Sequence, residues 1–256
     1  MSLRASAVAA IALALLAGVG FLAWRSGLLM RTDPDALWKV VHGLCVRDER
    51  VNHQPAPCVA VDLDKGYAVL RDQRGRTQVL VIPTARVTGI EDPAVQAPNA
   101  PNYWQDAWDS RALVQKLAGR PLPRDDVVLA VNSVYGRSQN QLHIHVDCIK
   151  TDVKHDLDAS LASVGATWSD FPAKLRGLTY RAIWIPGADL GANDPFKILA
   201  SGDPTARADM TRETLALIAA TSPAGAPGFV LVAERQYGHA ETLQDHSCQV
   251  LDASAG

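Results

Sequence analysis

The sequence has no excess of charge of either sign. Its 256 residues contain 25 Lys and Arg against 27 Asp and Glu, which gives a formal net charge of −2. This balance excludes a strongly basic protein that binds nucleic acid mainly by neutralising phosphates. The chain also lacks an internal repeat, and its 18 glycines and 15 prolines follow no period, so collagen-like order is excluded. With 48% hydrophobic and 20% charged residues, the composition is that of a globular protein with a buried core.

Charged residues are absent from Ala5 to Trp24, which form a long hydrophobic segment. As a helix this segment would span about 30 Å, enough to cross a bilayer once. A cleaved signal peptide and a buried core helix are the alternatives. We favour an uncleaved anchor over residues 1–31, because the apolar run exceeds a usual signal core and ends in the interfacial pair Trp24-Arg25.

Cysteine is scarce, and the four residues are Cys45, Cys58, Cys148 and Cys248. An even number downstream of an export-like segment is typical of two disulfides in an oxidising compartment, whereas buried free thiols are the alternative. Cys45 and Cys58 flank a polar loop with two prolines, which suits a local bridge and leaves the other two as a second pair. The sequence itself permits three pairings. We therefore expect the folded part of the chain to lie outside the cytoplasm.

Hydrophobic periodicity predicts an α+β fold for the exported part. We expect helices at 37–44, 103–118, 156–168 and 206–220, and Gly119 offers a stop for the second of these. We expect strands at 67–70, 78–83, 127–131, 142–149, 180–185, 229–234 and 248–251. Trp104 and Trp108 recur at helical spacing, which indicates core packing rather than a platform for ligand stacking.

The segment from Gln141 to Cys148 carries the strongest functional signal, because two histidines stand two residues apart in a predicted strand. Side chains alternate across a strand, so its polar and apolar residues face opposite sides. The polar set is Gln141, His143, His145 and Asp147, and the apolar set is Leu142, Ile144, Val146 and Cys148. We expect the histidine face to be solvated and functional and the other face to be core. Paired imidazoles indicate a catalytic or metal-binding role, with solvent-facing histidines on an edge strand as the alternative.

The preceding loop, residues 132–140, consists of small and hydrogen-bonding residues. Arg137 can offer a guanidinium fork, and Ser138 a hydroxyl, to phosphate oxygens, although the same residues occur in plain turns. Beside His143 and His145, the loop indicates an anionic substrate.

The order of these motifs resembles the histidine-triad (HIT) superfamily of nucleotidyl hydrolases and transferases. A hairpin, a helix, a strand ending in Asn132, a polar loop and a His-x-His strand follow one another from residue 60 to residue 150, with Gln141 at the first triad position. The whole chain is similar to a membrane-anchored bacterial branch of that superfamily that cleaves CDP-diacylglycerol. Besides the apolar N-terminus, this similarity rests on Cys45 and Cys58 around a Pro-rich loop, Gly66–Leu70, Ile82–Thr84, Asn99–Trp108, Asn132-Ser133, Gly136–Asn140, His143–His145 and Gln244–Cys248.

The resemblance implies a hydrolase that acts in two steps. His143 would attack the cytidylyl phosphorus and displace phosphatidate, and water would then release CMP, while His145 would contact the phosphate or the leaving oxygen. The implied substrate-binding residues are Asn132, Arg137, Ser138, Gln139 and Gln141. We expect Gln141 to supply its backbone and a neutral hydrogen bond in place of the first triad histidine.

The same resemblance implies the partners and the location of the protein. The scheme needs no metal, no cofactor and no nucleic acid. Its partners are the lipid-linked nucleotide CDP-diacylglycerol and the membrane. The chain would cross the bacterial inner membrane once and hold its catalytic domain in the periplasm.

Two other functions stay open. His143, His145 and Asp147 form a His-x-His-x-Asp pattern that zinc hydrolases use, with His155, His239 or His246 as further ligands, so a zinc-dependent phosphoesterase is the first alternative. An exported, membrane-anchored binding module without catalysis is the second. We interpret His246, beside Cys248, as a structural residue because no second His-x-His accompanies it.

The exported part divides into residues 32–150, a HIT-like catalytic domain with an antiparallel sheet and helices, and residues 151–256, a C-terminal α+β half. HIT proteins commonly pair two such units. We therefore interpret the second half as a degenerate second copy that forms an intrachain pseudo-dimer. A separately elaborated surface that faces the lipid is the alternative.

Overall fold

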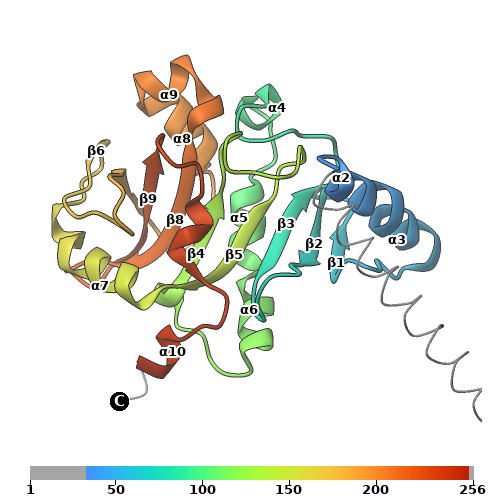
Figure 1. The fold of residues 1–256 in the computed structure, drawn as a ribbon, viewed down its shortest axis with the longest axis horizontal. Coiled ribbons are helices and arrows are strands. Elements are labelled where there is room, and N and C mark those ends of the chain that lie inside the picture. The colour runs from blue at the N-terminus through green and yellow to red at the C-terminus, as the bar shows by residue number, and fades with distance from the viewer. Residues whose placement is uncertain (1–32, 254–256) are drawn as a thin grey trace, which may run out of the picture.

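The structure is a computed structural model that describes residues 33–253 (Figure 1). Among these residues no helix has the length and apolar character that a bilayer crossing requires. The segment from Ala5 to Trp24, which the sequence predicts as a membrane anchor, lies outside the described residues.

A single antiparallel sheet connects the whole described chain. Its strands are β1 (Ala60–Asp62), β2 (Tyr67–Arg71), β3 (Val79–Pro83), β4 (Val127–Val131), β5 (Ile144–Ile149), β6 (Ser169–Asp170), β7 (Arg181–Pro186), β8 (Thr214–Thr221), β9 (Pro227–Glu234) and β10 (Gln244–Asp245). They follow the order β1-β2-β3-β5-β4-β8-β9-β7-β6, and β10 pairs with the end of β5. The predicted α+β class is confirmed, whereas membership of the HIT superfamily stays a prediction.

Helices and short helical turns join the strands. They are α2 (Ala36–Val40), the π-helical η1 (Val41–Cys45), α3 (Val46–Asn52), α4 (Pro93–Gln96), α5 (Tyr103–Asp109), α6 (Arg111–Ala118), α7 (Thr151–Ser160), α8 (Pro195–Gly202), α9 (Pro204–Ala208) and α10 (Val250–Ala253). Four 3-10 turns complete the set: η2 (Arg124–Asp126), η3 (Leu161–Ser163), η4 (Met210–Arg212) and η5 (Ala240–Leu243). The helix predicted over 103–118 is interrupted at Ser110, whose hydroxyl donates to the carbonyl of Asp106, and it ends at Gly119 as predicted.

Strand β3 is buried on both faces and separates two apolar clusters. Val79 and Val81 point into the larger cluster, which also contains the fully buried Trp104 and Trp108. Leu80 and Ile82 point the other way, into a smaller cluster beneath α2 and α3. The prediction that the tryptophan pair belongs to the core is therefore confirmed.

Both disulfides predicted from the sequence are present. Cys45 is bonded to Cys58 within the N-terminal helical unit, and Cys148 on β5 is bonded to Cys248 near the C-terminus. The first bridge closes a local loop, and the second joins segments 100 residues apart.

The helix predicted over 206–220 is wrong. Only Pro204–Ala208 and a 3-10 turn are helical there, and Thr214–Thr221 form β8 in the centre of the sheet, between β4 and β9. A strand buried on both faces is a continuous apolar run without alternation, and Leu215–Ala220 is such a run. Its Ala and Leu content gave the run a helical character that its place in the sheet overrides.

Two further boundaries of the C-terminal half differ from the prediction. The helix expected at 156–168 begins five residues earlier, at Thr151, and the strand expected at 248–251 is wrong because Val250–Ala253 are helical. Strand β10 ends at Asp245, and the chain turns before α10 at Cys248, which has a positive φ of 55° and is bonded to Cys148. Strands β7 and β9 are found where they were predicted. The interpretation of this half as a second copy stays a prediction.

Candidate functional site

A cleft of about 850 Å³ opens on the face of the sheet that carries His145, on β5, and His143, which directly precedes β5. Its polar lining consists of Arg71, Asp72, Gln73, Arg74, Asn132, Arg137, Ser138, Gln139, His143, His145, His239 and Glu241. Its apolar lining consists of Leu37, Val40, Pro57, Leu70 and Leu80. The cleft thus has a charged side that suits phosphate groups and an apolar side that suits a base or a lipid.

His143 has a defined tautomer. Its Nδ1 lies 2.7 Å from the carbonyl oxygen of Gln141, and because a carbonyl only accepts hydrogen bonds, Nδ1 carries the proton. The lone pair is therefore on Nε2. Burial, followed by the neighbouring His145, lowers the pKa of His143 to about 4, so that the ring is neutral at pH 7. A neutral imidazole with a fixed free nitrogen is a competent nucleophile.

His145 is buried and lacks hydrogen-bond partners. Only 4% of the residue is exposed, and within the described residues neither ring nitrogen makes a hydrogen bond. The nearest acid is Glu241, whose Oε2 lies 3.5 Å from Nδ1, and an oxygen of Asp72 follows at 4.0 Å. Burial lowers the pKa of His145, against the opposing charge of Glu241. Since unpaired polar groups are costly inside a protein, these nitrogens are suited to a ligand.

The expectation that the histidine face is solvated is wrong. Gln141, His145 and Asp147 are all buried, and His143 is only partly exposed. The segment that contains η5 and β10 crosses in front of β4 and β5 and covers this face (Figure 1). That segment follows β5 by about a hundred residues, so the strand pattern alone could not reveal it.

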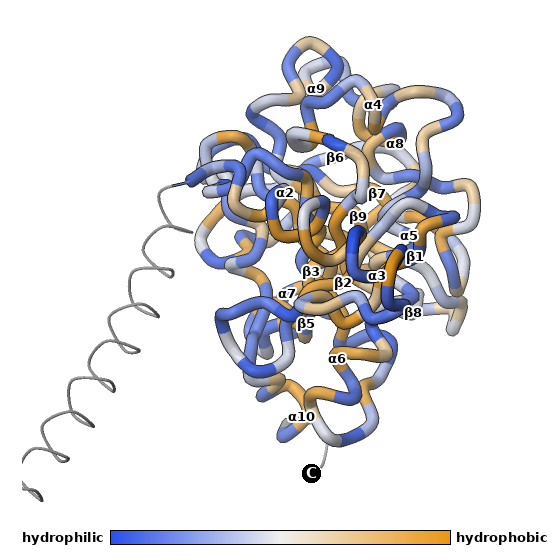
Figure 2. Tube along the Cα trace, turned by 90° about the vertical axis from the view of Figure 1, so that its right-hand side faces the viewer, coloured by the Kyte–Doolittle hydropathy of each residue, from blue (hydrophilic) through white to orange (hydrophobic). Residues whose placement is uncertain are grey.

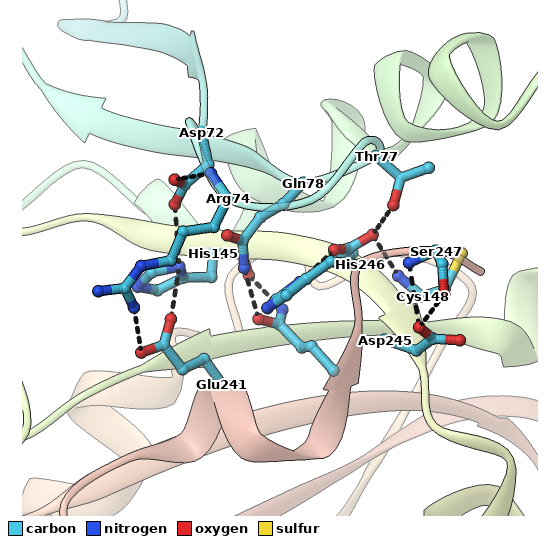
Figure 3. A network of polar contacts seen from close by, with 12 residues as sticks. Asp72, Arg74, Thr77, Gln78, His145, Cys148, Glu241, Asp245, His246 and Ser247 are labelled. Atoms are coloured by element: carbon cyan, nitrogen blue, oxygen red, sulfur yellow. Dashed lines mark hydrogen bonds and ion pairs between the residues drawn. The ribbon is translucent and has the colours of Figure 1, made fainter. Parts of the chain in front are cut away.

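Behind His145, a buried network surrounds Asp147 (Figure 3). One carboxylate oxygen accepts from the hydroxyl of Thr77 at 2.7 Å and from the amide of Cys148 at 2.9 Å. The other lies 2.7 Å from Nδ1 of His246. Burial raises the pKa of Asp147, and the bond to Asp147 raises the pKa of His246. This pair supports the interpretation of His246 as structural.

The β2–β3 hairpin is packed onto this network. Gly75 has a positive φ of 72°, and a Cβ there would lie 2.2 Å from the Cβ of His246, so only glycine fits. The amide of Arg76 donates to the carbonyl of His246 at 3.0 Å. These contacts hold Asp72 and Arg74 of the hairpin against the cleft.

Glu241 is the site residue that the sequence did not reveal. Its Oε1 lies 3.7 Å from Arg74 and 4.0 Å from Nδ1 of His239, and its other oxygen faces His145 (Figure 3). Burial alone would raise its pKa, but the charges of His145 and Arg74 outweigh this effect and leave the pKa of Glu241 below its ordinary value. No local motif marks it. The only sequence signal was its position between His239 and His246.

Among the predicted substrate-binding residues, Asn132, Ser138 and Gln139 line the cleft. The side-chain oxygen of Asn132 lies 3.5 Å from the amide of Glu241, and Ser138 is exposed. The amide group of Gln139 contacts the segment before α2, since it donates to the carbonyl of Asp33 and accepts from the amide of Leu37.

Arg137 and Gln141 take structural partners. Both terminal nitrogens of Arg137 lie 2.6 Å from the carboxylate of Glu91, so its charge is already paired at the edge of the cleft. Gln141 is fully buried, and its amide nitrogen donates to the carbonyls of Pro83 and Ala85. Two arginines with exposed side chains, Arg71 and Arg74, also line the cleft, and the sequence singled out neither.

The His-x-His-x-Asp pattern does not gather metal ligands. In residues 33–253, the one group of three or more candidate ligand atoms is Asp147 with Cys148 and Cys248, and those two sulfurs form a disulfide. Asp147 is turned toward His246 rather than toward the two histidines. His155 lies exposed on α7, away from the residues that line the cleft.

Comparison with known proteins finds relatives that cover most of the chain. Residues 32–252 match the family model described as CDP-diacylglycerol pyrophosphatase. A curated protein of Yersinia pestis named CDP-diacylglycerol pyrophosphatase is 39% identical over 226 residues, which is 86% of each chain. The matched region contains the cleft, both disulfides and both halves of the sheet. The chain therefore belongs to the CDP-diacylglycerol pyrophosphatase family, which is a family of enzymes.

Proposed function

We propose that the protein is a membrane-anchored hydrolase that cleaves CDP-diacylglycerol to CMP and phosphatidate through a nucleotidyl-histidine intermediate on His143. Family membership supports the substrate and the overall reaction. The observation that carries the mechanism is the 2.7 Å contact between Nδ1 of His143 and the carbonyl of Gln141, because it frees Nε2 for attack.

In the first step, the lone pair of His143 Nε2 forms a bond to the cytidylyl phosphorus. The bond from that phosphorus to the bridging oxygen breaks, and the oxygen leaves with phosphatidate. In the second step, water attacks the same phosphorus, the phosphorus–nitrogen bond breaks, and CMP leaves while the water gives up a proton. The carbonyl of Gln141 holds the Nδ1 proton throughout and stabilises the positive charge on the substituted ring.

His145 lies beside the reacting group, with its ring centroid 4.9 Å from that of His143. Its unpaired nitrogens contact the phosphate or the bridging oxygen, and Glu241 at 3.5 Å orients the ring and favours its protonated form when substrate charge enters the cleft. Arg74 supplies the exposed positive charge of this wall.

The substrate-binding residues divide into two groups. Asn132 and Ser138 offer polar groups directly to the diphosphate from the wall of the cleft. Arg137, Gln139 and Gln141 act through the backbone they hold, since their side chains already bind Glu91, the segment before α2 and the carbonyls after β3.

The sequence and the cysteines support the proposed anchoring and location. The uncharged segment from Ala5 to Trp24 supports a single membrane crossing, and two disulfides support an oxidising compartment such as the periplasm. A tethered enzyme meets a lipid-linked substrate at high effective concentration.

The test follows the cytidylyl phosphorus in the full-length chain. CDP-diacylglycerol labelled with ³²P at that phosphorus, mixed with enzyme and quenched within a turnover, should leave acid-labile label on the wild type and none on His143→Ala. His155→Ala, an exposed control on α7, should label like the wild type.

Two further readouts sharpen this test. Hydrolysis in H₂¹⁸O should place the ¹⁸O in CMP, and CMP release should survive a strong chelator. Heavy oxygen in phosphatidate, or wild-type protein that never carries label, would contradict the nucleotidyl-histidine route. Loss of activity with the chelator would instead favour the zinc-dependent alternative.

A further inference from the structure

Large hydrophobic side chains are exposed at only two places in residues 33–253. One group lies in the N-terminal helical unit and directly before and after β1, and it consists of Leu44, Val51, Val59 and Leu63. The other group lies in two loops and consists of Val134, Tyr135 and Tyr237. Val51 is 70% exposed and Tyr135 is 68% exposed, so these side chains meet solvent almost fully. We call the two groups together the rim.

Both groups of the rim border the cleft. Leu44 follows the cleft residue Val40 by about one helical turn, and Val59 follows the cleft residue Pro57 by two residues. On the other side, Tyr135 adjoins the cleft residue Gly136 in the chain. The ring of Tyr237 lies 4.9 Å from that of His239, which also lines the cleft. Four of the seven rim residues are therefore close, in the chain or in space, to residues that line the cleft.

The helical part of the rim has an interfacial character. Leu44 and Val51 are seven residues apart, so they lie on one helix face, together with the exposed Arg47. In Figure 2 the molecule is seen from the edge where α2, α3 and β1 lie, which is the edge opposite α7 in Figure 1. Aliphatic side chains with long cationic neighbours are typical of helices that lie on a membrane surface.

The loop part of the rim has the same character. Tyr135 and Tyr237 combine an apolar ring with a polar hydroxyl, which suits the boundary between lipid tails and headgroups. The guanidinium of Arg212, an exposed residue, lies 5.5 Å from the centre of the Tyr135 ring.

The start of the described chain points to the same surface. The carbonyl of Pro34 accepts from the amide of Asn140 at 2.6 Å, so the chain enters the fold beside the loop that lines the cleft. Pro34 is the ninth residue after Arg25, which directly follows the apolar segment, and nine residues span at most about 30 Å when fully extended. A membrane anchor over Ala5 to Trp24 would hold this loop within that distance of the bilayer.

We propose that the rim is a membrane-docking surface that seats the mouth of the cleft on the headgroup layer of a phospholipid bilayer. The lipid-linked diphosphate then enters the cleft from the side without leaving the membrane. This inference rests on the proposed function for the substrate, but the contact between rim and bilayer is a separate property of the protein.

Depth measurements on the full-length chain in phospholipid vesicles test the docking surface. All four native cysteines are in disulfides, so a nitroxide label reacts only with an introduced cysteine. We would label Val51→Cys and Tyr135→Cys, one from each group of the rim. Asp158→Cys on α7, whose side chain is 52% exposed, is the control on the opposite edge of the molecule.

The expected result is a several-fold higher ratio of collisions with oxygen to collisions with a water-soluble nickel chelate at both rim positions than at Asp158. Equal ratios at all three positions would overturn the proposal. Lipid contact at Val51 alone would also overturn it, because proximity to an anchor would then suffice.

A second experiment separates docking from catalysis. Val51→Asp combined with Val59→Asp should lower CMP release from vesicle-bound CDP-diacylglycerol several-fold and leave release from detergent micelles unchanged. An equal loss in both would show damage to the enzyme rather than to docking and would count against the rim. Absence of CMP from the wild type would contradict the proposed function and leave the depth result intact.

Discussion

The segment that carries the two histidines, residues 141–148, differs between its two ends in how far its polar side chains are hydrogen-bonded. At the cleft, His143 has one free nitrogen and His145 has two nitrogens without hydrogen bonds among the described residues. Four residues further on, Asp147 is bonded through both oxygens to Thr77, Cys148 and His246. The same face of one segment therefore holds an unsatisfied, reactive end and a satisfied, structural end. The unpaired nitrogens of His145 lower the stability of the fold at the cleft, and the hydrogen bonds of Asp147 raise it at the other end of the segment.

The largest expected effect is at the reactive end. His143→Ala should lower kcat by about 1,000-fold or more, because the nucleophile is removed, while the free energy of unfolding changes little. CMP release and urea unfolding measure the two quantities. A variant that keeps more than a tenth of wild-type kcat would remove His143 from the mechanism.

His145→Leu should separate activity from stability. We expect kcat/KM to fall by about 100-fold, as for loss of a general acid or a charge-stabilising group. The free energy of unfolding should rise by about 1 kcal/mol, because two buried unpaired nitrogens are replaced by a side chain of similar size. A decrease in stability would mean that the nitrogens of His145 have hydrogen-bond partners in the folded protein. The proposed difference between the two ends of the segment would then be wrong.

At the structural end, Asp147→Ala should lower the stability of the fold and leave kcat largely unchanged. Its removal leaves Thr77 and His246 without their partner, which should cost about 3 kcal/mol of unfolding free energy. kcat at a temperature well below unfolding should stay within about tenfold of the wild type. Asp158→Ala, which loses one exposed pair with Lys154, is the control and should change stability by less than about 0.5 kcal/mol.

The two ends also predict opposite dependences of stability on pH. The pKa of His143 is lowered to about 4, so between pH 4 and 6.5 the unfolded chain binds more protons, and stability rises with pH. The pKa of His246 is raised, so its contribution is complete below pH 6.5 and is lost as pH rises through the higher value. Urea unfolding across pH 4.5–9 measures this dependence in the wild type and in two variants. In His143→Ala the rise of unfolding free energy with pH should be smaller than in the wild type. In Asp147→Ala the fall of unfolding free energy at higher pH should be smaller.

A modest effect on turnover is expected at Gln141. Its buried amide binds the carbonyls of Pro83 and Ala85, and its own carbonyl is what fixes His143. Gln141→His keeps that carbonyl, so turnover should change by less than about 100-fold, or 2.7 kcal/mol of barrier. A larger change in either direction would give the side chain a direct part in the reaction.

The parts of the fold that could be predicted are those with local signals. The β2–β3 hairpin, β4, β5 and both disulfides could be predicted because β-rich apolar runs, turn residues and cysteine spacing act over short stretches. Thr214–Thr221 was not readable, because an Ala- and Leu-rich run becomes a strand only through its neighbours β4 and β9. Tertiary contacts decided that element.

The candidate site shows the same division. His143 and His145 were found from their spacing, and Asn132 and Ser138 from the loop before them. Arg137 was taken for a free phosphate ligand because Glu91, its partner, is 46 residues away. Glu241 reaches His145 from a segment nearly a hundred residues further along the chain, and no local pattern could assign it.

The bridge between Cys148 and Cys248 has a consequence for the maturation of the enzyme. It closes a loop of 100 residues and fastens Glu241 and His246 beside the strand that bears the histidines. In the chain-entropy treatment, a closure of this length stabilises the fold by about 4–5 kcal/mol. In a nascent or reduced polypeptide, His143 is therefore present before the disulfide has fixed Glu241 beside His145. With the proposed location outside the cytoplasm, competence would arrive late in biogenesis, when the last stretch of sequence has been exported and Cys248 has been oxidised.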